Sequence, residues 1–327
     1  MPELPEVQTV IDDLNKKIKG DIVADFWSDW PKAIKGKSLK EFQKEIKNRK
    51  ILNARRIGKN IFVDLSGKKT LYIHLKMTGH LLVKAQNTNN KAQTKHKAQN
   101  TKSQKYDYFS DRVNQYIHHI WYLADAKQRM KSESTKSTKN TKDKFVDTHN
   151  FVGSNRTLEF SDMRKFAKIV LDDTEKINNL SEIRKLGVDA MSPQFTLKKF
   201  KEILKKKENK PVGIILMDQE SIAGIGNIYR SEILFESNVF PQRKIKTLKD
   251  IEIKKIYQNI KKVLKKAIKL RGTSDSDYRD TEGKPGGFQK IMKVYQQAGK
   301  KCPKCDTIIK RMTLGQRSVF YCSKCQK

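Results

Sequence analysis

Four cysteines at the end of this 327-residue chain constrain its fold more than any other feature. They follow the pattern Cys302-x2-Cys305-x16-Cys322-x2-Cys325, and the chain has no others. Two Cys-x2-Cys knuckles at this spacing are typical of a zinc ribbon, in which four thiolates surround one tetrahedral ion. The alternative is two disulfides, which are rare in a chain without a secretory signal. Because four protein ligands leave no open position for water, we predict one structural zinc ion.

The beginning of the chain carries a different kind of signal. Its residues Pro2-Glu3-Leu4-Pro5-Glu6-Val7 follow the start methionine directly. Removal of Met1 would leave Pro2 as a free secondary amine beside the Glu3 carboxylate, and an α-amino group, which titrates near pKa 8, is partly nucleophilic at neutral pH. Apolar residues at helical spacing predict an amphipathic helix from Pro5 to Lys19. Taken alone, a Pro-Glu start is equally an ordinary helix-start signal.

The net charge of the chain limits the classes of molecule that it is expected to bind. Lysine and arginine number 70 against 36 acidic residues, which gives a formal net charge of +34. Such a field attracts polyanions, and nucleic acid is the leading candidate. An anionic membrane surface is the competing interpretation, but no apolar run approaches the roughly 18 residues that span a bilayer. We therefore expect a soluble cytoplasmic protein that binds nucleic acid.

The pattern of apolar residues divides the chain into a β-rich first half and a helical second half. Predicted strands cover 61–65, 70–75, 157–160 and 169–171, and predicted helices cover 197–206, 228–237 and 251–270. Leu186 to Pro193 contains turn residues that favour a connection between domains. The predicted organisation is an N-terminal β domain at 1–186, a linker at 187–194, a helical domain at 195–290 and a zinc ribbon at 291–327.

A segment at about 84–142 interrupts the β domain. It is rich in Lys, Gln, Asn, Thr and Ser, a composition that cannot bury enough apolar surface to fold. Aromatic and apolar residues between 106 and 123 are the exception, and we expect them to dock as one helix or a strand pair. We interpret the segment as an insertion with flexible ends whose lysines are solvated; nonspecific contacts of these lysines with DNA are the alternative. His118 and His119 have no nearby metal-ligand partners and receive no role.

A glycine-rich turn precedes one of the predicted helices. Gly224-Ile225-Gly226-Asn227 leads into the helix that begins near Ile228. Glycines there allow backbone N–H groups to approach an anion at the helix N-terminus. A plain helix-start turn is the alternative, but the basic charge of the chain favours a phosphate site.

Four motifs in order along the chain carry a family resemblance: MPELPEV, AGIGNIY, GKPGGFQ and GQRSVFYCSKCQK. Together they resemble the formamidopyrimidine-DNA glycosylases, bacterial enzymes that excise oxidised purines, over nearly the whole chain except the insertion. The resemblance implies an α+β multidomain fold: an N-terminal β-sandwich with a flanking helix, a helix-two-turns-helix domain and a zinc ribbon. It also implies a monomeric enzyme, associated with the nucleoid, that binds damaged double-stranded DNA in the cleft between domains.

The resemblance implies a catalytic set made of Pro2, Glu3, Lys59 and Arg317. Pro2 would attack C1′ of the damaged nucleotide to form a Schiff base, and Glu3 would shuttle protons to the opening sugar. Lys59 would engage a phosphate near the lesion. Arg317 would grip the DNA backbone from the zinc hairpin, which explains why a metal-held hairpin is useful. β- and δ-elimination would follow and cut the strand, with no organic cofactor.

The resemblance also implies a set of DNA-binding residues. His74 and Asn227 would grip phosphates. Met77, Arg164 and Phe166 would fill the gap left by the flipped base, which offsets part of the cost of a few kcal/mol for flipping. Without the resemblance, Met77 and Phe166 would be interpreted as core residues of a β-sheet.

Some features depart from the family pattern or leave a choice open. Lys76 and Ala167 stand where the family usually has glycine, so the backbone near the gap-filling residues is expected to differ slightly. The loop from Arg271 to Gly287, which includes Thr273, Ser274 and Tyr278, aligns with the family's lesion-recognition loop. Two alternatives are an endonuclease VIII-like glycosylase for oxidised pyrimidines and a non-catalytic DNA-binding protein of the same fold.

Overall fold

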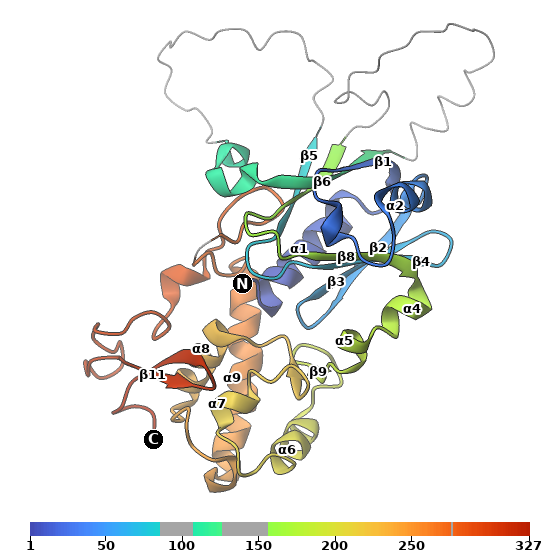
Figure 1. Ribbon diagram of the computed structural model, residues 1–327. Coiled ribbons are helices and arrows are strands. Elements are labelled where there is room, and N and C mark those ends of the chain that lie inside the picture. Colours follow the sequence, from blue (N-terminus) through green and yellow to red (C-terminus); the bar gives the residue numbers. More distant parts are fainter. Residues whose placement is uncertain (86–106, 126–155, 276) are drawn as a thin grey trace, which may run out of the picture.

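The computed structural model describes residues 1–85, 107–125, 156–275 and 277–327. A β-sandwich and a helical domain lie one above the other, and the C-terminal hairpin lies beside the helical domain (Figure 1). Within the described ranges, no helix is long and apolar enough to cross a membrane.

The N-terminal domain consists of two four-stranded antiparallel sheets. The first has the order β1-β6-β7-β5 and the second the order β2-β3-β4-β8. Apolar side chains from both sheets pack into one buried core, as expected for strands with one face turned inward. The bounds are β1 Ile22–Ser28, β2 Ile51–Ile57, β3 Asn60–Leu65, β4 Lys69–His74, β5 His80–Ala85, β6 Ile117–Ala124, β7 Arg156–Ser161 and β8 Lys168–Asp173.

Helix α1 (Leu4–Lys17) joins this core to the rest of the molecule. Its bounds lie within two residues of the predicted helix, and Pro5 occupies the first turn, where its missing N–H costs nothing. Val7, Val10 and Leu14 are fully buried in the sandwich core. Leu4 instead packs in the core of the helical domain. The N-terminus is therefore fixed at the junction between the two domains (Figure 1).

The middle of the predicted insertion belongs to the sheet itself. Strand β6 (117–124) pairs with β1 on one side and β7 on the other. Its Trp121 and Leu123 are buried in the core, so the apolar residues of the segment dock as expected, as one strand of the first sheet. The predicted flexible ends, with residues 86–106 and 126–155, lie outside the described residues.

The second half is helical, as predicted. Its main helices pack around a second core. A short parallel pair of β9 with β10 ties the connection after the sandwich to the turn before α8. The bounds are α2 Leu39–Ile46 in the first domain, then α4 Thr174–Asn178, α5 Ser181–Arg184, β9 Val188–Asp189, α6 Leu197–Lys205, α7 Val212–Ile215, β10 Ile222–Ala223, α8 Asn227–Ser237, α9 Asp250–Lys269, β11 Lys310–Leu314 and β12 Arg317–Tyr321.

Candidate active site and zinc finger

A cavity of about 340 Å³ opens at the N-terminus of α1. Its walls come from all three parts of the molecule, so it exists only because the domains are packed together. Five predicted site residues lie in it, and the exposed Met1 side chain lies at the same place. Its lining includes Met1, Glu3, Lys59, Met77, Asn227, Thr273, Asp275, Tyr278, Tyr295 and Arg317.

Glu3 is held by the N-terminus of α8. Its carboxylate accepts hydrogen bonds from Gly226 N at 2.8 Å and from Ile228 N at 3.0 Å. A Cβ on Gly226 would lie 2.3 Å from the Glu3 carboxyl carbon, so only glycine permits this approach. The glycine-rich turn thus does bind an anion at a helix N-terminus, but the anion is Glu3. The predicted phosphate site at these N–H groups is wrong for this reason.

Glu6 is a second buried carboxyl group, which the sequence analysis missed. It accepts hydrogen bonds from Glu3 N at 2.7 Å, from Thr273 N at 2.7 Å and from the Tyr229 hydroxyl at 2.5 Å. Burial raises its pKa to about 7; the Glu3 charge acts in the same direction, whereas the hydrogen bonds oppose it. Glu3 and Glu6 are three residues apart, on one turn at the start of the helix, and this spacing is the sequence signal that could have identified Glu6.

Lys59 lies in the turn between β2 and β3 and is buried. Burial lowers its pKa, and the charges of Glu3 and Glu6 oppose that shift. Gly58 before it has a φ of +59° and packs against Ala223 of the second domain. Lys59 is thereby placed in the same cavity as Glu3.

Arg317 reaches the cavity from the first position of β12. The hairpin is tied to α8 through Arg230, a buried residue that the sequence analysis missed. Its guanidinium donates to Ser318 O at 3.3 Å, to Gly213 O at 3.3 Å and to the Asn227 side chain. Burial lowers the Arg230 pKa to about 10. Asn227 therefore lines the cavity while its oxygen is already engaged by arginine.

His74, Arg164 and Phe166 do not line the cavity. The Nδ1 atom of His74 accepts a hydrogen bond from Lys76 N at 2.9 Å. Burial lowers the His74 pKa to about 4, so its ring is neutral at physiological pH. Its remaining nitrogen can then act only as a neutral donor toward a phosphate.

Residues 162–167 form an exposed loop, called the wedge loop here. The Phe166 side chain is 52% exposed, and the Arg164 guanidinium lies 4.9 Å from the centre of its ring. Asp162, fully buried, accepts hydrogen bonds from Phe166 N at 2.9 Å and from Ala167 N at 3.0 Å. Exposed apolar side chains on a fixed loop suit the predicted gap-filling role.

The expected change in backbone near this loop takes a specific form. Lys76 has a φ of +55°, and Lys165 has the same value. This left-handed region favours glycine, so Lys76 keeps a conformation suited to glycine at the position where the family has glycine. Ala167 is buried and needs no such conformation.

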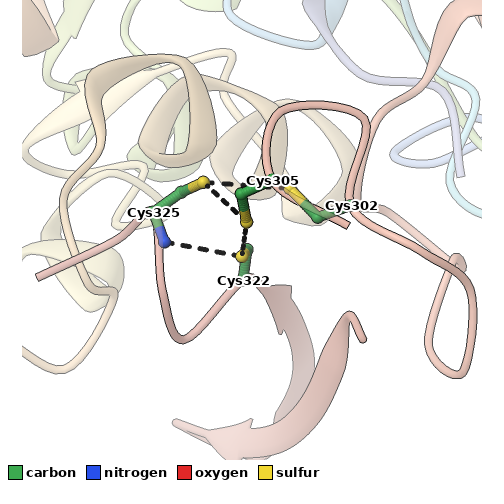
Figure 2. Close-up of side chains that lie close together, drawn as sticks. All are labelled: Cys302, Cys305, Cys322 and Cys325. Carbon is green, nitrogen blue, oxygen red and sulfur yellow. Dashed lines mark hydrogen bonds between the residues drawn. The ribbon is translucent and has the colours of Figure 1, made fainter. Parts of the chain in front are cut away.

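The four cysteines meet at the base of the hairpin (Figure 2). Their Sγ atoms all lie within 4.8 Å of one another, with measured separations of 3.3, 3.4 and 3.9 Å. Tetrahedral Zn–S bonds of 2.3 Å place sulfurs about 3.8 Å apart, whereas a disulfide needs about 2.05 Å. These cysteines are free of disulfides and hold one structural zinc ion.

Comparisons with known proteins agree along the whole chain. The formamidopyrimidine-DNA glycosylase N-terminal domain matches residues 1–169, the H2TH domain of the same glycosylases matches 186–278, and the zinc finger found in FPG and IleRS matches 299–327. The formamidopyrimidine-DNA glycosylase of Pelotomaculum thermopropionicum is 32% identical over 100% of this chain and 99% of its own. That of Carboxydothermus hydrogenoformans is 32% identical over 100% of both chains.

Solved structures agree as well. Lactococcus lactis Fpg in complex with DNA containing an abasic site superimposes with a TM-score of 0.74, at 25% identity over 99% of both chains. A variant of that protein in complex with DNA containing Fapy-dG gives a TM-score of 0.75, at 25% identity over 100% of both chains. This chain therefore belongs to the formamidopyrimidine-DNA glycosylase family and is a DNA-binding repair glycosylase with a zinc finger.

Proposed function

We propose that this protein removes oxidised purines, 8-oxoguanine and formamidopyrimidines, from double-stranded DNA, and that the Pro2 amine is its nucleophile. The observation that carries the proposal is the position of the N-terminus. It lies in a cavity with a carboxylate, a buried lysine and an arginine, on the segment that joins the two domains. Removal of Met1 would present the Pro2 nitrogen to this cavity.

The reaction can be written with these groups. The lone pair of the Pro2 nitrogen forms a bond to C1′ as the bond from C1′ to the base nitrogen breaks, and the base leaves with that electron pair and takes up a proton. The amine then passes its own proton to the Glu3 carboxylate. Opening of the sugar breaks the C1′–O4′ bond and leaves an iminium ion, with O4′ protonated by Glu3. Abstraction of a C2′ proton expels the 3′ phosphate, and a second elimination expels the 5′ phosphate.

Lys59 and Arg317 supply positive charge on two sides of the same cavity. The burial of Lys59 favours a role at a phosphate, because an anion brought beside a buried ammonium is poorly screened by water. Arg317 offers a planar guanidinium suited to bidentate phosphate contacts. We infer that His74 and Asn227 contact further phosphates and that Met77, Arg164 and Phe166 fill the vacated stack. The protein acts as a monomer in this proposal.

The decisive experiment is borohydride trapping with a duplex that carries one 8-oxoguanine opposite cytosine, followed by peptide mapping of the cross-link. A cross-link at Pro2 supports the processed N-terminus, the iminium ion and the substrate class together. Pro2→Gly should abolish the cross-link, and Glu3→Gln should permit binding without strand cleavage. Unchanged strand cleavage in both variants contradicts the mechanism.

The outcome also separates the two alternatives. Trapping only with oxidised pyrimidines would support the endonuclease VIII-like activity. Binding to every lesion duplex without any cross-link would support a non-catalytic DNA-binding protein of this fold.

A further inference from the structure

Two loops next to the candidate active site come from different domains. The recognition loop, described at residues 271–275 and 277–287, lines the cavity with Thr273, Asp275 and Tyr278. The wedge loop carries Arg164 and Phe166, which are exposed and are not part of the cavity lining. In the proposed function one loop faces the flipped base and the other faces the gap that the base leaves.

A buried polar network runs between these loops. Its four members are at most 4% exposed: Thr78, His80, Asn114 and Asp162. At one end, Asp162 binds the backbone of the wedge loop and accepts a hydrogen bond from the Thr78 hydroxyl. At the other end, the Asn114 amide donates to Gly283 O of the recognition loop at 3.2 Å.

His80 connects the two ends. Its Nε2–H donates to the Asn114 side-chain oxygen at 2.7 Å, and its Nδ1 lies 3.2 Å from the carbonyl oxygen of Thr78. Burial lowers the His80 pKa, which favours a neutral ring with a single N–H. Because both neighbours of the ring are acceptors, a neutral His80 donates to Asn114 and only contacts the Thr78 carbonyl oxygen. The path from Gly283 to Phe166 is therefore hydrogen-bonded from Gly283 to His80 and from Thr78 to Phe166, and the contact between His80 and Thr78 joins the two parts.

A second tie holds the recognition loop from outside. The Arg279 guanidinium donates to the Asp111 carboxylate at 3.0 and 2.9 Å. Asp111 and Asn114 belong to one short segment, 107–116, whose role the sequence analysis left open. That segment therefore braces the recognition loop against the β-sandwich by two independent contacts.

A buried polar network is costly unless it is fully paired, and apolar side chains would fill the same space without that cost. We propose that Thr78, His80, Asn114 and Asp162 are positioning residues that couple the recognition loop to the wedge loop. Through them, capture of the flipped base and filling of the gap become one cooperative step. The proposal rests on the proposed function, because it assigns those tasks to the two loops.

A double-mutant cycle across the network tests the coupling directly. Phe166→Ala weakens the wedge loop, and Arg279→Ala releases the recognition loop. The readout is the ratio kcat/KM for an 8-oxoguanine duplex. With His80 unchanged, the fold-decrease in kcat/KM caused by Phe166→Ala and Arg279→Ala together should be smaller than the product of the two separate fold-decreases, by about fivefold or more. In a His80→Leu background the two losses should simply multiply.

Matched variants separate coupling from a general structural effect. His80→Gln places an amide donor near the position of Nε2 and should retain the coupling. His119→Leu makes the same exchange elsewhere in the sandwich, at a buried histidine whose ring nitrogens have no hydrogen-bond partner among the described residues. It should leave the coupling intact. Should His80→Leu not fold, Thr78→Val removes the hydroxyl link to Asp162 and tests the same chain.

Two results overturn the inference: losses that multiply in the otherwise unchanged protein, or coupling that survives His80→Leu. The same cycle measured as binding affinity for the lesion duplex needs no catalysis, so it decides the coupling even if Pro2 does not react. Cleavage of a duplex with a preformed abasic site tests the Pro2 chemistry separately. Abasic cleavage without coupling contradicts only this inference, whereas coupling in binding without abasic cleavage contradicts only the proposed function.

Discussion

The zinc hairpin and the wedge loop both expose a side chain that we expect to contact DNA, but they are held in different ways. Arg317 stands on a two-stranded hairpin whose base is fixed by four cysteines (Figure 2). Phe166 stands on a loop fixed by one buried carboxylate, Asp162. The hairpin packs on a small apolar cluster, whereas the wedge loop follows a strand of the large sandwich core. A small module with little apolar core requires a metal ion to fix its backbone, whereas a loop on a packed sheet is fixed by a single carboxylate.

The recognition loop is also held by a buried carboxyl group, that of Glu6, but the surroundings of Glu6 differ from those of Asp162. Among the described residues, Asp162 is surrounded by hydrogen-bond donors. Glu6 has donors as well, but it lies beside a second carboxylate, Glu3, and its pKa is raised to about 7. The anchor of the recognition loop is therefore sensitive to pH near neutrality.

Loss of the zinc ion should have the largest effect. Metal binding contributes roughly 10–16 kcal/mol to the folding of zinc-finger peptides, so Cys305→Ser should unfold the hairpin. DNA affinity should fall by roughly 100-fold, which corresponds to about two charge-assisted contacts. Fluorescence anisotropy at fixed salt measures the affinity, and hydrogen exchange should show β3 protected and β12 unprotected. Ser323→Ala, an exposed neighbour in the same knuckle, is the control. Full affinity without metal would contradict the role of Arg317.

The next largest effect is the pH dependence of stability that comes from Glu6. Below pH 4.5 the carboxyl group is protonated in both folded and unfolded chains. Between pH 4.5 and about 7 only the folded chain keeps this proton, so the free energy of unfolding falls as pH rises through that window. The fall should be about 3 kcal/mol, and Glu6→Gln should remove it from urea-unfolding curves measured across the window. Glu202→Gln, an exposed carboxylate on α6, should leave the slope unchanged. A slope that persists in Glu6→Gln would assign it to other groups.

Asp162→Asn should weaken the wedge loop without affecting the zinc hairpin. The amide replaces an oxygen that accepts hydrogen bonds from Phe166 N and Ala167 N, so it leaves buried donors unpaired and costs about 2 kcal/mol. Hydrogen exchange should accelerate at 163–167 and remain unchanged at 317–321. Asp12→Asn, on the exposed face of α1, is the matched control. Equal acceleration in both regions would mean that the two are not held independently.

Local sequence patterns predicted what depends on neighbours in the chain. The cysteine spacing predicted the metal, and the apolar pattern predicted α1, α6, α8 and α9. Helices α1, α6 and α9 bury an apolar face, whereas α8 is buried on nearly all sides. The apolar run of strand β6 was predicted to dock, but its local pattern did not decide between a helix and a strand, because its partners β1 and β7 come from elsewhere in the chain.

Contacts between distant segments could not be predicted from the sequence alone. The N–H groups of Gly226 and Ile228 have the pattern of a phosphate site, yet Glu3, more than 200 residues earlier, occupies them. Asp162 and Arg230 gave no signal for the same reason, since a single acidic or basic residue has no periodicity. Their roles appear only once the fold supplies the partners.

The smallest expected effect concerns the backbone beside the wedge residues. Lys76 adopts a φ of +55°, which is strained for any side chain, so Lys76→Gly should stabilise the protein by about 0.5–1 kcal/mol. Lys76→Ala removes the same charge without relief of the backbone and should not stabilise it. Lys68 has a φ of +56° in the turn between β3 and β4, and Lys68→Gly should give a similar gain far from the wedge loop. Chemical unfolding measures all three variants. Excision of 8-oxoguanine then decides what the strain does. If Lys76→Gly lowers excision and Lys68→Gly leaves it unchanged, the strain at Lys76 positions Met77. If both variants excise equally well, the strain at Lys76 is a property of the turn alone.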